Sequence, residues 1–234
     1  MGNSLRYDHV TGERRIGRES TRNLELISAH VEQYIGPVAN VIHETASQFV
    51  HVDVLHVLPF AKRNFHVLVT SGLSDRPMNA PRGSEDCRYA ELYLCLPAAW
   101  PLRTQDLSDE RNNWPIRLLQ MLGRFPHAFD AWLWMYHTVP NFDPPKPYAA
   151  STRLCGAMLA PPISVPTDFA SLKVPGSDPI YFFSVLPLYQ EEMDFKIRNG
   201  GEPLMANLFR QGLIADIVDP ARKSVIQKKR FGLF

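Results

Sequence analysis

Three short apolar segments with the residue pattern of β-strands follow one another in the first half of the chain, at residues 51–59, 65–70 and 89–96. In the first segment the polar residues His51 and Asp53 alternate with valines, which is the period of a strand with one face in solvent. Only a few polar residues separate the first two segments, and such a short link suits an antiparallel hairpin. The sequence therefore predicts a mostly antiparallel sheet.

Helical patterns occur on both sides of these segments. Apolar residues recur at helical spacing over 24–35, and Trp114 is followed by a proline, which predicts that a helix starts there. Two later apolar segments, at 154–159 and 180–189, are predicted to be buried strands, and helical patterns return over 192–214. This order of elements favours an α+β fold with a mostly antiparallel or mixed central sheet flanked by helices.

The folded part of the chain is expected to be a single domain. A chain of 234 residues with 45% hydrophobic content is long enough to bury one large core. We assign this domain to residues 21–215. A flexible N-terminal arm at 1–20 is expected before it, and a solvated, basic C-terminal tail at 216–234 after it.

Charge and cysteine content narrow the classes of function. The 25 Lys and Arg nearly balance the 24 Asp and Glu, so the chain has no strong positive electrostatic field that would attract nucleic acid, and no nucleic-acid partner is expected. No apolar run approaches the roughly 20 residues that a bilayer-spanning helix needs, so no membrane partner is expected. The 3 cysteines form no CxxC pair and are odd in number, which fits a reducing cytoplasm.

The sequence contains none of the common motifs for phosphate binding, nucleophile elbows or zinc proteases. Ser71 follows a predicted strand, where a nucleophile could be presented. A thiol hydrolase would instead use Cys155 together with His137 and Asp143, which are the residue types that such catalysis needs. We expect no enzymatic activity and no catalytic residue, and the hydrolase stays an alternative.

A metal site is not expected either. His51 and Asp53 would project from the same strand face, and their residue types bind transition metals. Two ligands are too few to hold zinc, however, because structural and catalytic zinc sites use three or four protein ligands. The sequence therefore indicates no bound metal and no cofactor.

One long loop, at residues 137–148, carries four prolines together with aromatic, acidic, basic and imidazole groups. Each proline fixes its own φ angle and restricts the residue before it, so the loop loses little entropy when it is held in one shape. Ordered loops of this length are usually functional. We expect this loop to be a surface for recognition.

Several strings of the sequence, taken in order, resemble the Suppressor of fused family. They are HVDVLHVLP from residue 51, TSGLSDRPM from 70, AELYLCLP from 90, WPI from 114, the loop at 137–148, LCGAML from 154 and LPLYQEE from 186. The resemblance extends over residues 24–215, which is nearly the whole predicted domain.

This resemblance implies an α+β domain without established enzymatic activity. Animal members of the family bind zinc-finger transcription factors of Hedgehog signalling, and they hold an extended peptide by strand addition in a cleft between two domains. Bacterial members resemble them over a single domain and are thought to be immunity proteins that neutralise toxin domains. The present chain is similar to the single-domain type, so a cytoplasmic immunity protein that binds a toxin domain is the expected function.

The alternative is a regulator that sequesters a transcription factor or signalling partner by binding an extended peptide. An unpaired strand edge beside the 137–148 loop would favour that alternative. The resemblance also suggests which side chains contact the protein partner. They are Asp53, Ser71, Asp75, Glu91, His137, Asn141, Phe142, Asp143 and Tyr148.

Overall fold

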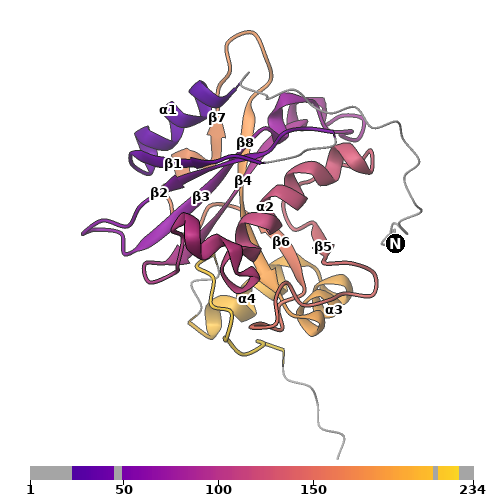
Figure 1. Cartoon of the computed structure of the whole chain (residues 1–234). Helices are drawn as coiled ribbons and strands as arrows, with labels where there is room; N and C mark the ends of the chain where they lie inside the picture. Colours follow the sequence, from indigo (N-terminus) through magenta and orange to yellow (C-terminus); the bar gives the residue numbers. More distant parts are fainter. Residues whose placement is uncertain (1–22, 45–48, 213–215, 227–234) are drawn as a thin grey trace, which may run out of the picture.

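The computed structural model describes residues 23–44, 49–212 and 216–226, and the N-terminal arm expected at 1–20 lies outside these ranges. The described residues form four α-helices, eight strands and four short 3-10 helices (Figure 1). In chain order the elements are α1 (Leu24–Tyr34), β1 (Val38–Ile42), β2 (Asp53–Val57), β3 (Phe65–Ser71), η1 (Leu73–Asp75), η2 (Glu85–Cys87), β4 (Tyr89–Pro97), η3 (Thr104–Ser108), α2 (Glu110–Ala128), β5 (Thr138–Pro140), β6 (Gly156–Ala160), η4 (Thr167–Ala170), β7 (Ser171–Leu172), β8 (Ile180–Leu188), α3 (Gln190–Asn199) and α4 (Gly201–Arg210).

The strands of the described part form one sheet in the order β1-β2-β3-β4-β8-β6-β5, and the short strand β7 pairs with β8. All neighbours are antiparallel except β4 and β8, which are parallel. The predicted hairpin is present, because β2 and β3 pair from Asp53 opposite Ser71 to Val57 opposite Val67. The expected α+β fold with a mixed, mostly antiparallel sheet is confirmed.

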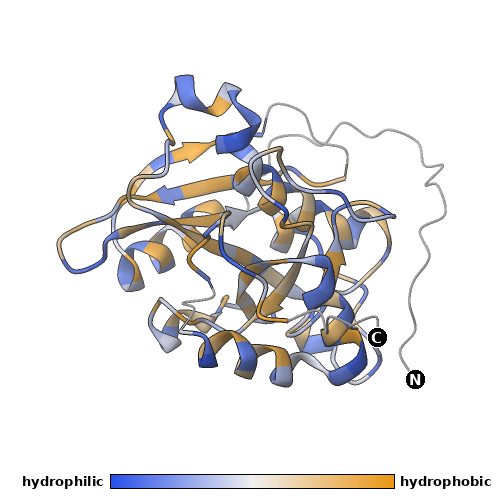
Figure 2. Ribbon diagram, turned by 90° about the horizontal axis from the view of Figure 1, so that it is seen from below, coloured by the Kyte–Doolittle hydropathy of each residue, from blue (hydrophilic) through white to orange (hydrophobic). Residues whose placement is uncertain are grey.

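Helices cover both faces of the sheet (Figure 1). On one face Ile27 of α1 belongs to a buried cluster with Val67 of β3, and on the other face Leu119 of α2 belongs to a second cluster with Leu68. Consecutive residues of β3 therefore face different cores. Figure 2 shows the strands largely in the hydrophobic colour, whereas the helices combine hydrophobic and hydrophilic faces.

The predicted solvent-exposed face of β2 is wrong. All five residues of β2 are buried, Asp53 is only 5% exposed, and His51 just before the strand is 9% exposed. The alternation of polar and apolar residues has a different cause here. The polar groups pair with one another inside the protein, as buried polar groups must.

Helix α2 begins before the residue that the sequence indicates. Its first residue is Glu110, and the side chain of Asp109 caps it by accepting a hydrogen bond from the Arg111 N–H at 2.9 Å. Pro115 therefore lies inside the helix and not in its first turn. The helix therefore begins directly after the capping residue Asp109, earlier in the chain than Pro115 indicated.

The end of the chain packs more tightly than expected. Residues 216–226, which we call the C-terminal strap, run against the domain. Ile217 forms a parallel bridge with Cys95 of β4, and Val225 is 6% exposed in a cluster with α3 and α4. The solvated tail predicted from residue 216 is wrong for this strap, because its apolar residues fill a core.

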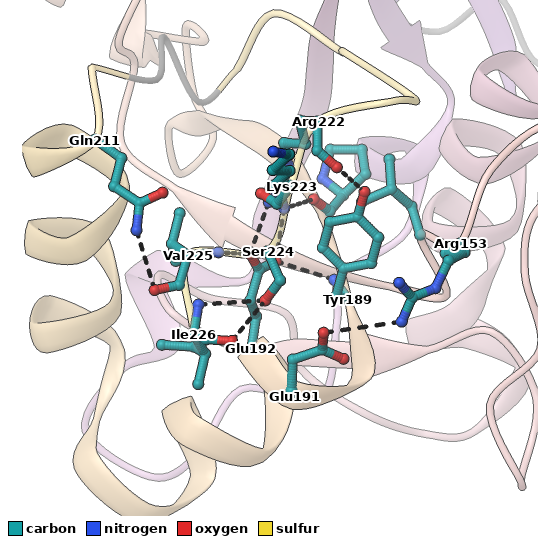
Figure 3. A network of polar contacts seen from close by, with 12 residues as sticks. Arg153, Tyr189, Glu191, Glu192, Gln211, Arg222, Lys223, Ser224, Val225 and Ile226 are labelled. Atoms are coloured by element: carbon teal, nitrogen blue, oxygen red, sulfur yellow. Dashed lines mark hydrogen bonds and ion pairs between the residues drawn. The ribbon is translucent and has the colours of Figure 1, made fainter. Parts of the chain in front are cut away.

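One buried ion pair fastens the C-terminal strap (Figure 3). Arg222 donates two hydrogen bonds of 2.6 Å to the carboxylate of Glu192, which is 0% exposed. The same carboxylate accepts the N–H groups of Tyr189 and Val225, at 3.0 and 2.9 Å. A buried carboxylate needs such partners, because an unpaired charge in the interior is very costly.

Two buried histidines lie on adjacent strands. The ring nitrogens His56 Nε2 and His66 Nδ1 are 2.8 Å apart, and the two residues are 3% and 7% exposed. His66 Nε2 also lies 3.2 Å from the Ala98 carbonyl. Burial, with smaller electrostatic contributions from His66 and Arg63, lowers the pKa of His56 to about 4, and burial also lowers the pKa of His66. This pair is therefore neutral in the folded protein at neutral pH.

We expect the free energy of unfolding to fall as the solution is acidified. The unfolded chain takes up a proton on His56 below about pH 6.5, whereas the folded chain resists protonation until about pH 4, so stability present above pH 6.5 is lost toward pH 4. This one residue costs about 2 kcal/mol between pH 7 and pH 5. Urea unfolding at both pH values measures the loss, and His56→Asn is expected to reduce it. An equal pH dependence in the two proteins would contradict the assignment.

Candidate functional site

A groove of about 780 Å³ lies along α2, between the end of β1 and the 137–148 loop. α2 contributes half of its lining residues, and each end is formed by a segment distant in sequence. Its lining combines apolar, charged and amide side chains: Ile42, His43, Glu44, Leu107, Glu110, Asn113, Trp114, Ile116, Arg117, Leu118, Gln120, Met121, Arg124, Asn141, Phe142, Lys146, Pro147 and Tyr148. Mixed apolar and polar concavities of this size are typical of binding sites.

Two stacked aromatic rings form part of the groove wall. The rings of Trp114 and Tyr148 have centroids 5.2 Å apart and are inclined by only 6°. Among the described residues, neither the indole N–H of Trp114 nor the hydroxyl of Tyr148 has a hydrogen-bond partner, although both atoms are buried. Buried tyrosine and tryptophan polar groups usually find a partner. Burial also raises the pKa of Tyr148 well above its ordinary value, so its hydroxyl stays protonated.

The loop beside these rings is held in place by its own contacts. The Asn141 side chain donates to the carbonyls of Lys146 and Pro147, at 2.7 and 3.3 Å. Next to it, Phe142 is 66% exposed and has a φ of 73°, in the left-handed region that large side chains rarely adopt. The Lys146 ammonium lies 5.4 Å from the Phe142 ring centre. The loop thus presents an aromatic side chain on a fixed backbone, and Asp143 is exposed beside it.

His137, the first residue of the loop, contacts the segment that precedes it. Its Nδ1 lies 3.0 Å from the Trp132 carbonyl and 3.2 Å from the Trp134 N–H, and its ring meets the Trp132 ring edge-on. Burial lowers the pKa of His137, so its ring is neutral at pH 7. These contacts join the start of the loop to the segment at Trp132–Trp134.

The thiol needed for a hydrolase is poorly placed for catalysis. Cys155 is 5% exposed, and burial raises the pKa of its thiol, which is opposite to the shift of a reactive cysteine. Ser71 is likewise 5% exposed, at the end of β3. Neither side chain opens to the surface as a nucleophile must.

Asp53 lies in a polar cluster at the β1 end of the groove. Its carboxylate is 3.0 Å from His43 Nδ1 and 2.8 Å from His51 Nε2, and it accepts the Glu44 N–H at 3.1 Å. The Glu44 carboxylate in turn accepts the Val52 N–H at 3.0 Å and forms an ion pair with Arg124. The cluster fixes the end of β1 against β2 and α2.

Glu91 is at the centre of a buried hydrogen-bond network. It is 0% exposed and accepts four hydrogen bonds: from the Thr70 hydroxyl at 2.5 Å, from the N–H groups of Gly72 and Ser74, both at 3.0 Å, and from the Ser74 hydroxyl at 2.7 Å. Burial raises the pKa of Glu91, and these hydrogen bonds oppose the rise. Glu91 therefore shapes the turn that holds half-buried Asp75.

The structure places the predicted partner-binding residues in different parts of the molecule. Asn141, Phe142 and Tyr148 lie together in the groove. Asp143 is exposed on the loop, Asp53 contacts His43 at the groove's β1 end, and His137 is the first residue of the loop. Ser71 is the last residue of β3, Asp75 ends η1 just after it, and Glu91 is in β4. The sequence did not predict Trp114 as a binding residue, and it gave no role to His43 or Arg124, which also line the groove. The string Trp-Pro-Ile was a signal for Trp114, but nothing local indicated His43.

In the part of the chain that the structure describes, no helix is long and apolar enough to cross a membrane.

No curated protein matches the chain. The fold is similar to a crystal structure of a Suppressor of fused homologue from Neisseria gonorrhoeae, with a TM-score of 0.61 and 16% identity, covering 87% of this chain and 97% of that one.

The fold is also similar to that in the Sufu–Fu complex, with a TM-score of 0.60 and 17% identity over 87% of this chain and 92% of the other. Drosophila Suppressor of fused gives a TM-score of 0.59 and 16% identity over 87% of this chain, but only 51% of its own length is covered. The sequence model of the Suppressor of fused protein matches residues 49–223. This chain therefore belongs to the Suppressor of fused family.

Proposed function

We propose that this chain binds and masks a toxin domain, as an immunity protein, through the groove along α2 and the loop beside it. The fold and family suggest a protein-binding domain, and the family is regulatory and not known for catalysis. The observation that carries the choice of surface is the pair of stacked rings in the groove, Trp114 and Tyr148. Their buried N–H and O–H groups have no partner among the described residues.

The groove offers what a protein partner needs for tight binding. The exposed Phe142 ring is an aromatic anchor at its edge, and aromatic residues contribute most often to binding hot spots. Its backbone is already fixed by the Asn141 hydrogen bonds, so binding orders little of the chain. Once bound, this chain neutralises the toxin by covering the toxin's active surface.

We expect Phe142→Ala to weaken the complex with the toxin about 30-fold or more, since truncation of a hot-spot residue costs about 2 kcal/mol or more. The partner is sought by co-expressing the chain with toxic domains encoded beside its gene and scoring growth, and affinity is then measured by calorimetry. Phe209→Ala is the matched control, because Phe209 is 51% exposed on α4, away from the groove. Equal affinity of the two variants would refute the groove, and failure of every neighbouring domain to bind would refute the immunity role.

The second candidate is a regulator that binds an extended peptide at a sheet edge. β5 is a terminal strand and lies within the 137–148 loop, but it has only three residues, and Pro140 has no N–H to donate. β1 is the more suitable edge: it has five residues, two of them exposed, and within the described ranges it pairs only with β2. Slower amide hydrogen exchange in β1 upon binding would favour this candidate, whereas slowing confined to the groove loop would favour the toxin complex.

A further inference from the structure

Three metal-ligating side chains converge where β1 ends and β2 begins. His43 follows β1, His51 precedes β2, and Asp53 is the first residue of β2. One ligand atom from each lies within 4.8 Å of the other two. The antiparallel register causes this convergence, because Ile42 pairs with Val54 and the next residues, His43 and Asp53, are therefore opposite each other.

We propose that His43, His51 and Asp53 bind one divalent transition-metal ion, with Zn²⁺ as the preferred ion. Two imidazoles and one carboxylate suit zinc, iron, cobalt or nickel and are a poor set for Ca²⁺ or Mg²⁺, which prefer oxygen ligands. His43 supplies the third ligand that the sequence pair His51 and Asp53 lacked. Three protein ligands are enough for a zinc site that keeps one position open.

The distances in the cluster suit this ion. Ligand atoms placed about 2.0–2.1 Å from a tetrahedral zinc ion are roughly 3.3–3.4 Å apart. The Asp53 carboxylate oxygens are already 3.0 Å from His43 Nδ1 and 2.8 Å from His51 Nε2. An imidazole N–H that donates to a carboxylate must lose that proton, or move it to its other nitrogen, before the nitrogen can bind a metal. The ion would therefore replace the hydrogen bonds of the metal-free cluster, and the ligand atoms, which now lie within 4.8 Å of one another, would move closer together around it.

The surroundings hold the carboxylate and leave the site accessible. Asp53 is 7% exposed in its side chain and accepts the Glu44 N–H at 3.1 Å, which fixes its orientation as supporting partners of metal ligands do. The charges of the nearby pair Glu44 and Arg124 compensate each other. The His43 ring is 70% exposed, so an ion can enter from the solvent and a water molecule can complete its coordination.

The test uses the full chain without an affinity tag, titrated with Zn²⁺ in competition with a chromophoric chelator. We expect one equivalent to bind to the wild-type protein and to raise its melting temperature. His43→Ala is expected to weaken binding at least about 10-fold, the lower end of the effects measured around metal sites. Because the His43 ring is exposed, this variant keeps the fold. Asp53→Asn is a second variant whose binding should also fall.

The matched control is His127→Gln, because His127 lies outside the cluster, with its ring nitrogen 2.9 Å from the Leu73 carbonyl. Its Zn²⁺ affinity should equal that of the wild type. Cobalt substitution gives an independent readout, and visible absorption without a thiolate charge-transfer band is expected. The proposal is overturned if His43→Ala binds Zn²⁺ as the wild type does, if the cobalt spectrum shows thiolate ligation, or if no stoichiometric binding occurs.

Discussion

Replacing Arg222 by methionine is expected to lower the free energy of unfolding by about 3–5 kcal/mol, because breaking a buried ion pair leaves its partner uncompensated. The partner is Glu192, whose side chain is 0% exposed and receives two hydrogen bonds of 2.6 Å from Arg222. The methionine also removes the hydrogen bond from Arg222 to the Pro187 carbonyl at 2.9 Å. Urea unfolding followed by circular dichroism measures the change.

An exposed pair of the same chemistry is the control. Arg111 and Asp109 form an ion pair with side chains that are 65% and 30% exposed, so Arg111→Met should destabilise the protein far less than Arg222→Met does. Adding Glu192→Gln to Arg222→Met removes the uncompensated charge, and this double variant should be more stable than Arg222→Met alone. Similar losses for Arg222→Met and Arg111→Met would contradict the burial argument.

Replacing Gly72 by alanine is expected to cost at least about 4 kcal/mol or to prevent folding. A Cβ at this position would lie 1.9 Å from the backbone carbonyl oxygen of His51, and backbone atoms can move only by shifting the strand end. The φ angle of Gly72 is 133°, which side chains rarely adopt. Its N–H also donates to Glu91 at 3.0 Å, so any shift weakens the buried network around that carboxylate.

A substitution at Gly83 separates the two causes of the expected loss at Gly72, which are the steric clash of the new Cβ and the unfavourable φ angle. The φ angle of Gly83 is 89°, but no heavy atom lies within 4 Å of an added Cβ. Gly83→Ala therefore tests backbone strain alone and should cost about 1 kcal/mol. Differential scanning calorimetry of both variants gives the comparison. A Gly72→Ala protein as stable as Gly83→Ala would show that the strand end yields to the new methyl group.

The regular elements that could be predicted from sequence are those with a local signal. The helix at Leu24–Tyr34 has its apolar residues at helical spacing, and the hairpin of β2 and β3 has strand segments joined by a short link. β1 and β5 were missed, because five and three residues carry little pattern and their pairing partners lie elsewhere in the chain. The burial of both sheet faces was missed for a related reason: only the packed helices show that a polar residue such as Asp53 points inward.

The candidate site shows the same limit. Phe142 and Tyr148 could be proposed from their loop, since aromatic residues among prolines are a local signal. Trp114 becomes part of the same surface only through the stacking of its ring on Tyr148, thirty-four positions away by residue number. His43 and Asp53 meet only because β1 and β2 pair in one register. Such convergence depends on tertiary structure and is not encoded in any single segment.

The C-terminal strap has a consequence for the order in which the chain can fold. Glu192 lies in the first turn of α3, and its cation, Arg222, comes 30 residues later. During synthesis, α3 therefore leaves the ribosome before the group that neutralises its buried carboxylate exists. The nascent domain cannot bury Glu192 as a charged group until the strap has emerged. The packing of α3 around Glu192 is therefore a late step of folding, and α3 stays exposed in the incomplete chain.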